Sequence, residues 1–91
     1  MTDLYTDGNA LAGPLTEIFA ADMSMAERVC AHCGDRGVVA RLHVYDHAPG
    51  VVARCPTCQG VNIRLVRAND RAWLDLRGVV SLEIPLSATD V

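Results

Sequence analysis

Two hydrophobic periodicities divide the chain near Met25. Before that residue, the apolar positions are Leu11, Leu15, Ile18 and Phe19. Their spacing of three or four residues is typical of one apolar face of a helix. After Met25, apolar and polar residues alternate with a period of two, as in strands that bury one face. The pattern predicts a short amphipathic N-terminal helix followed by a mainly β domain.

Two residue types limit where this helix begins. Asp7 and Asn9 are both suitable N-caps, because their side chains can accept a hydrogen bond from a free backbone N–H. Pro14 would clash with the preceding turn deep inside a helix, so the helix must begin near Pro14 or kink there. We expect the apolar face of the helix to pack against the sheet.

The alternating region divides into segments at residues that favour turns, at positions 46–50 and at Asn69–Asp70. Within residues 38–45, alternation assigns Val39 to the face opposite Leu42. We predict three parts: a tail and amphipathic helix at 1–24, a zinc-ribbon-like antiparallel sheet at 25–85, and a loose C-terminal tail at 86–91. The predicted strands are Met25–Cys30, Val38–Tyr45, Val51–Cys55, Val61–Arg67, Ala72–Arg77 and Val79–Ile84.

All four cysteines of the chain lie in two Cys-x-x-Cys pairs, Cys30–Cys33 and Cys55–Cys58. Two such pairs at this separation predict a site in which four thiolates bind one metal ion. Gly34 and Gly60 follow the pairs closely, and glycine accepts the positive φ that a tight knuckle requires. The sequence therefore predicts one metal ion per chain, bound by Cys30, Cys33, Cys55 and Cys58.

The size of the chain makes such a metal important for folding. A domain of 91 residues has a modest core, whereas a structural zinc ion supplies roughly 10–16 kcal/mol of binding energy that is also folding energy. The first residues lack the basic and apolar regions of a secretory signal, and no apolar run approaches a membrane span. We therefore expect a cytoplasmic protein with reduced cysteines in preference to disulfides.

The ligand set favours zinc over iron and argues against catalysis. A catalytic zinc keeps a position for water, whereas four cysteines close the coordination shell. His32 is interpreted as an exposed knuckle residue, because neighbouring residues in a tight knuckle seldom both bind the metal. The Cys55-Pro-Thr-Cys58 pair is similar to that of rubredoxins, which bind iron for electron transfer. However, Gln59 and the low content of aromatic residues depart from that pattern. We predict a protein that is not an enzyme.

Charge suggests where a partner binds. The net charge is −3 and the pI about 5.4, yet all eight arginines lie between residues 28 and 77. Arginines beside aromatic residues can bind single-stranded nucleic acid, but an acidic chain suits a protein partner better. Protein docking is therefore the first hypothesis and nucleic-acid binding the alternative. The candidate partner face is Arg41, His43, Arg54, Arg64, Trp73 and Arg77, with Tyr45 and Asn62 beside them.

The order of strands and knuckles over residues 25–77 resembles that of zinc ribbons. A narrower resemblance covers most of the chain, through Asp7–Pro14, the two knuckles and Trp73–Gly78. In these segments the chain resembles a small actinobacterial family described only as a domain of unknown function. The resemblance implies a stand-alone bacterial zinc ribbon without assigned activity. It also implies an oxidoreductase as one candidate partner, since some family members are encoded beside flavin or molybdopterin oxidoreductases.

Overall fold

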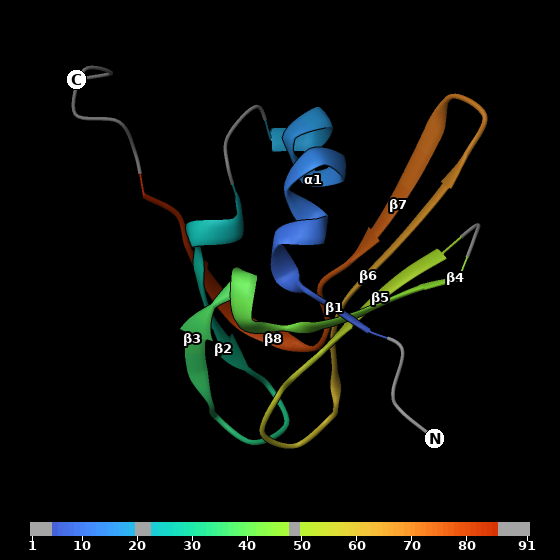
Figure 1. Ribbon diagram of the computed structural model, residues 1–91. Coiled ribbons are helices and arrows are strands. Elements are labelled where there is room, and N and C mark those ends of the chain that lie inside the picture. Colours follow the sequence, from blue (N-terminus) through green and yellow to red (C-terminus); the bar gives the residue numbers. More distant parts are fainter. Residues whose placement is uncertain (1–4, 20–22, 48–49, 86–91) are drawn as a thin grey trace.

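A computed structural model describes residues 5–19, 23–47 and 50–85 and shows two antiparallel sheets beside a short helix (Figure 1). The larger sheet has the strand order β1-β4-β5-β6-β7 and the smaller one the order β3-β2-β8. The mainly β, antiparallel fold predicted from the sequence is therefore confirmed. The strands are β1 (Thr6–Asp7), β2 (Glu27–Cys30), β3 (Arg36–Val38), β4 (His43–His47), β5 (Gly50–Arg54), β6 (Val61–Ala68), β7 (Arg71–Asp75) and β8 (Val79–Glu83).

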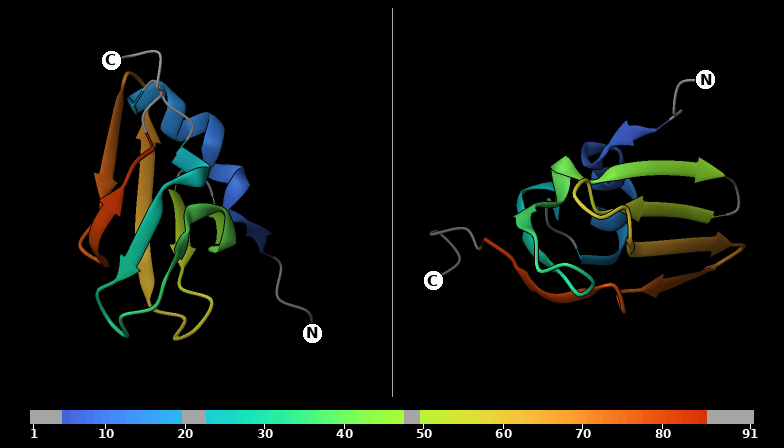
Figure 2. Two further views of the ribbon diagram at one scale, coloured as in Figure 1. Left: turned by 90° about the vertical axis from the view of Figure 1, so that its left-hand side faces the viewer. Right: turned by 90° about the horizontal axis from the view of Figure 1, so that it is seen from below.

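The N-terminal helix follows the rules that the sequence set for it. A 3₁₀ helix, η1 (Gly8–Leu11), comes first, and the backbone N–H of Asn9 donates to Asp7 Oδ1 at 3.0 Å. The α-helix α1 (Ala12–Phe19) then begins at Ala12, so Pro14 lies in its first turn, where no intrahelical N–H is needed. Leu11 and Leu15 are buried in the hydrophobic core, and Figure 2 shows α1 beside the larger sheet. The side chains of the other two apolar positions lie outside the described part of the structure.

The predicted strand over residues 38–45 is wrong, because the chain changes sheets there. A 3₁₀ helix, η3 (Val39–Arg41), separates β3 from β4. A 3₁₀ helix has three residues per turn, so Val39 and Leu42 both point inward, and each is 0% exposed. A Cβ on Gly8 would lie 1.6 Å from the Val39 carbonyl oxygen, so only glycine lets η1 approach η3 this closely. The single predicted sheet is consequently two sheets.

The other predicted strands are present with small shifts at their ends. Asn69 adopts a φ of 56° in the turn between β6 and β7, which asparagine accepts more readily than most residues. Arg77 lies beyond the end of β7, although it was predicted inside that strand. A further 3₁₀ helix, η2 (Met23–Met25), precedes β2. The predicted C-terminal tail at 86–91 and part of the predicted N-terminal part, at 1–4 and 20–22, lie outside the described residues.

One hydrophobic core joins the helices to the two sheets. The core residues are Leu11, Leu15, Met23, Ala26, Val39, Leu42, Val44, Ala53 and Ile63. In the described part of the chain, no helix has the length and apolar character that crossing a bilayer requires.

The β2–β3 and β5–β6 connections meet at one end of the molecule, at the bottom of Figure 1. These connections are the two cysteine knuckles, so the fold brings one knuckle from each sheet together.

Candidate metal centre

The four cysteine sulfurs form one compact cluster. All four Sγ atoms lie within 4.8 Å of one another. The Sγ atoms of Cys30 and Cys58 are 3.7 Å apart, and those of Cys33 and Cys55 are 3.8 Å apart. Four thiolates at about 2.3 Å from a central ion would form a tetrahedron with edges of about 3.8 Å, whereas a disulfide requires about 2.05 Å. The cysteines are free, and their geometry is that of a metal-binding cluster.

Both knuckles use the same backbone turn to aim their sulfurs. In the first, the Gly34 N–H donates to the Cys30 carbonyl at 2.9 Å, and in the second the Gln59 N–H donates to the Cys55 carbonyl at 2.9 Å. The N–H groups of His32 and Thr57 point at the Sγ atoms of Cys30 and Cys55, each at 3.4 Å. These amide dipoles favour the thiolate form, which is the form that binds a metal.

The two glycines that follow the knuckles have different roles. Gly34 has a φ of 82°, as the sequence predicts, but in the second knuckle Gln59 takes the positive φ, at 66°, in place of Gly60. Gly60 is needed for space, because a Cβ there would lie 2.5 Å from His32 Cδ2. His32 is exposed, and its Nε2 lies 3.1 Å from the Val61 carbonyl. Since a carbonyl only accepts, that nitrogen carries the proton.

A buried arginine, which is not among the site residues predicted from the sequence, supports the second knuckle. Arg28 is 0% exposed, and its Nη2 donates to Asp35 Oδ2 at 2.8 Å and to Cys55 Sγ at 3.6 Å. The hydrogen bond from Arg28 holds the pKa of Asp35 below its usual range. Arg28 precedes Cys30 by two residues in β2, so alternation places both on one face. The spacing of two residues between Arg28 and Cys30 was the sequence signal that could have placed Arg28 beside the cysteines.

Asn62 supports the first knuckle in a similar way. Its Nδ2 donates to Cys30 Sγ at 3.3 Å and to the Gly78 carbonyl at 2.8 Å. The Ala31 N–H donates to the same carbonyl at 2.9 Å. The expectation that Asn62 belongs to an exposed face is wrong, because only 1% of it is exposed. A Cβ on Gly78 would lie 1.8 Å from the Val61 carbonyl oxygen, so glycine is required for this close contact.

The thiol pKa values show why a cation suits the cluster. Burial raises the pKa of Cys30, but hydrogen bonds from Asn62 and from backbone N–H groups lower it to about 6. The Asp35 N–H lowers the pKa of Cys33, but burial and the three neighbouring thiols raise it to about 12. Four adjacent thiols therefore cannot all ionise at neutral pH without a positive charge between them. A metal ion supplies that charge and accepts all four sulfurs as ligands.

The larger sheet carries several predicted partner residues on the side away from α1. Opposed residues in an antiparallel pair point to the same side. His43 is opposite Arg54, and Arg64 is opposite Asp75. Trp73 is opposite Val66, and 54% of it is exposed. We call this side the outer face, and by register it includes His43, Tyr45, Val52, Arg54, Arg64, Val66, Trp73 and Asp75.

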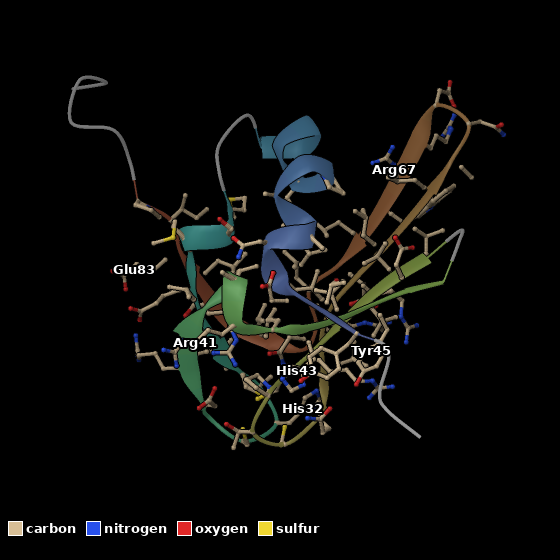
Figure 3. All side chains as sticks on the ribbon, viewed as in Figure 1. His32, Arg41, His43, Tyr45, Arg67 and Glu83 are labelled. Carbon is tan, nitrogen blue, oxygen red and sulfur yellow. The ribbon has the colours of Figure 1, made fainter. Side chains whose placement is uncertain are left out.

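Aromatic rings gather at one end of the outer face. The rings of Tyr5 and His43 stack with centroids 4.0 Å apart, and Tyr45 lies 5.7 Å from Tyr5. The guanidinium carbon of Arg54 is 6.0 Å from the centroid of the Tyr45 ring. Arg41 is in η3 and not on a strand, so the sheet register does not place it on this face; Figure 3 shows it to the left of His43.

Arg77 reaches the outer face from the turn after β7. Its Nη2 donates to Asp75 Oδ2 at 2.6 Å, and its Nε lies 3.1 Å from both carboxylate oxygens. These bonds lower the pKa of Asp75 to about 2. The ion pair therefore persists through neutral and mildly acidic pH and is lost only as the pH falls toward that value. The structure thus brings Arg54, Arg64, Trp73 and Arg77 to one side of the molecule with His43.

Comparison with known proteins identifies the family. No curated protein and no solved structure matches the chain significantly. The family described as a family of unknown function, DUF6510, matches residues 2–87. The resemblance seen in the sequence is therefore confirmed at the level of a family without an assigned function. Because the match spans nearly the whole chain, this protein belongs to the DUF6510 family.

Proposed function

We propose that this protein is a non-enzymatic zinc module of the cytoplasm that docks onto another protein through the outer face. The observation that carries the proposal is the tetrahedral spacing of the four sulfurs, 3.7 and 3.8 Å across two pairs of the cluster. A shell closed by four thiolates has no position for a reactive water, so the ion is structural. The docking role is supported by the exposed tryptophan and arginines of the outer face.

The choice of zinc rests on the surroundings of the cluster. Four thiolates suit zinc or iron equally well. An iron centre for electron transfer is usually enclosed by aromatic rings, and this chain has only one Trp, two Tyr and one Phe. Tyr45 and Trp73 lie on the outer face by register. Elemental analysis of the purified protein should give one zinc per chain and no visible colour. Iron at one per chain, with a red chromophore, would contradict this assignment.

The docking role rests on the composition of the outer face. Trp and Arg are the residues that most often anchor protein interfaces. Trp73 is 54% exposed and does not belong to the hydrophobic core. Arg64 is on the neighbouring strand, opposite Asp75, two residues from Trp73. An exposed tryptophan that becomes buried against a partner removes a large apolar area from water, and this burial would stabilise the complex.

A partner can be identified with the zinc-loaded chain as bait and then tested with purified components. We expect saturable binding of the purified partner that weakens about tenfold or more in Trp73→Ser, the loss typical of an interface anchor. Val80→Ser is the matched control, because Val80 is 69% exposed but lies on the smaller sheet. Equal losses in both variants, or no loss in Trp73→Ser, would exclude docking through the outer face.

Binding of single-stranded nucleic acid is the second candidate function, favoured by the position of Arg54 over the Tyr45 ring. Rings interleaved with cations are typical of such platforms. Phosphate contacts weaken steeply with salt. Retention on single-stranded DNA or RNA that falls as salt rises, and that is lost in Arg54→Gln, would favour this role over protein docking.

A further inference from the structure

A cavity of about 360 Å³ opens beside the metal centre. Three segments that are distant in sequence line it. The first knuckle contributes His32, the start of β6 contributes Asn62 and Arg64, and the end of β7 and the turn after it contribute Asp75 and Arg77. Figure 3 shows His32 at the end of the molecule that carries the knuckles. The lining of the cavity therefore runs from the first knuckle to residues of the outer face.

The charges of the cavity favour a ligand with one negative charge. Arg77 is already neutralised by Asp75, which it contacts at 2.6–3.1 Å. The Arg64 side chain forms neither a hydrogen bond nor an ion pair within the described ranges of the chain, although it lies opposite Asp75 in the sheet and its charge helps to lower the pKa of that carboxyl. The cavity thus has one positive charge to offer, in a protein whose net charge is −3. A carboxylate, which carries one negative charge, would be held by this local charge and not by the charge of the whole protein.

Asn62 adds a hydrogen-bond acceptor to this cation. Its Nδ2 must face the Gly78 carbonyl and Cys30 Sγ, because the reversed amide would bring two oxygens together. The orientation leaves Oδ1 buried and without a hydrogen-bond partner. An unsatisfied buried acceptor is costly, so a donor that reaches it is stabilised. Asn62 is one of the residues that line the cavity, so a ligand bound there would lie next to its side chain.

We infer that the cavity binds the C-terminal carboxylate of a partner protein's chain. Arg64 binds the carboxylate, and Asn62 Oδ1 accepts the N–H of the last residue. The two side chains are two residues apart on one strand, roughly 6.7 Å along it, which a single residue with a hydrogen bond at each end can bridge. The residues that precede the terminus would lie along the outer face toward Trp73. This inference rests on the proposed docking function.

Short peptides can test this on the zinc-loaded full chain by titration with NMR detection. The main probe is N-acetyl-glycyl-alanine with a free carboxylate. Its matched controls are the same peptide with a C-terminal amide, acetate alone, and N-acetyl-aspartyl amide, which carries its carboxylate on a side chain. We expect the free-acid peptide to bind, and to shift the side-chain amide of Asn62 and the backbone of Gly78. The C-terminal amide should bind about tenfold more weakly or not at all, because it loses a charge-assisted hydrogen bond.

Variants identify the groups responsible. Arg64→Gln should weaken the free-acid peptide about tenfold or more, because Arg64 is the cation that binds the carboxylate. Arg71→Gln is the matched control, since Arg71 belongs to the same hairpin and its side chain pairs with Asp70, at 3.9 Å, in the part of the chain that the structure describes. Removing the same charge at the hairpin tip should leave the affinity unchanged. Zinc content and the thermal melt confirm that both variants stay folded.

Several outcomes would overturn the inference. Lack of binding of the free-acid peptide at millimolar concentration would show that the cavity holds only water. Equal binding of acetate or of the side-chain acid would show a general anion site without recognition of a chain end. Equal affinity in Arg64→Gln and wild type would place the site elsewhere. If the purified partner still binds Arg64→Gln as tightly as wild type, the docking function stands and the terminal-carboxylate inference fails.

Discussion

In the first knuckle, Cys30 Sγ accepts a hydrogen bond from the neutral amide of Asn62, whereas in the second, Cys55 Sγ lies beside the buried charge of Arg28. Each supporting residue comes from the other sheet, because Arg28 is in β2 and Asn62 is in β6. The knuckles therefore share one backbone turn but are braced crosswise by different chemistry. As a result, the metal centre joins the two sheets through its supporting side chains as well as through its ligands.

The two supporting side chains also differ in their effect on the charge of the metal centre. Four thiolates around one divalent ion have a net charge of −2, and hydrogen bonds from neutral donors stabilise that charge without changing it. Arg28 changes it, because its guanidinium is fully buried near Cys55. Asp35, which is 30% exposed, partly returns a negative charge at the edge of the centre. We therefore expect loss of Arg28 to cost more than loss of Asn62.

The largest effect should come from opening the shell itself. Cys55→Ser removes one thiolate, and the chain would lose much of the roughly 10–16 kcal/mol that the proposed structural zinc would contribute. We expect loss of cooperative unfolding in the variant and in wild type treated with a chelator, followed by circular dichroism. A wild-type-like thermal melt in either sample would show that neither knuckle depends on the metal.

Arg28→Met tests the charged brace. The variant keeps the apolar stem but removes the buried cation, so we expect destabilisation of about 3 kcal/mol and a loss of zinc affinity of about 10–100-fold. Denaturant unfolding and chelator competition measure the two quantities. Arg36→Met is the control, because Arg36 pairs with Glu27 at 3.6 Å on the exposed surface. Similar effects in both variants would mean that the buried charge has no special role.

Asn62→Ala tests the neutral brace. It removes the donor to Cys30 Sγ and to the Gly78 carbonyl, for an expected loss of about 1–3 kcal/mol. The loss of zinc affinity, measured by the same chelator competition, should be smaller than in Arg28→Met. A larger loss in Asn62→Ala than in Arg28→Met would show that the neutral hydrogen bond to Cys30 contributes more to metal binding than the buried charge near Cys55.

Asp35→Asn tests the charged brace through its pH dependence. Arg28 lowers the pKa of Asp35 in the folded state. A carboxylate of this kind contributes stability above its unfolded pKa, about 3.9, and loses it as the pH falls through the folded pKa. The stability difference between wild type and Asp35→Asn should therefore be complete at neutral pH and shrink as the pH falls below about 4. A difference that does not depend on pH would exclude the ion pair as its cause.

The smallest effects concern the positive-φ positions, which differ between the knuckles. Gly34 has open space around its Cα, so Gly34→Ala meets only backbone strain, for an expected cost of about 1–2 kcal/mol. Gln59 already carries a side chain at φ 66°, so Gln59→Gly should not destabilise the fold, because glycine accepts this conformation readily. Thermal melts of both variants and of wild type measure the two changes in stability. Destabilisation by Gln59→Gly would show that contacts of the glutamine side chain outweigh its backbone strain.

The features of this protein that depend on local pattern can be predicted from its amino-acid sequence. The two Cys-x-x-Cys pairs predict a four-sulfur cluster, because ligands close together in the chain need only a tight turn to share one ion. The period of two predicts strands, and Pro14 with Asp7 limits where the first helix begins. The segments Asp7–Pro14 and Trp73–Gly78 also indicate the family, since a family resemblance is carried by the residues themselves.

The packing of the two sheets, in contrast, determines which polar residues support the cluster and where the chain passes from one sheet to the other. Alternation places Arg28 on the same face as Cys30, but the burial of Arg28 and Asn62 arises only because two hairpins meet at the knuckles. The inward position of Val39 depends on η3, which breaks the alternation. The cavity that joins His32 to Arg64 likewise exists only in the assembled fold. Local periodicity records which face a strand buries, whereas contacts between segments far apart in sequence depend on how the sheets pack together.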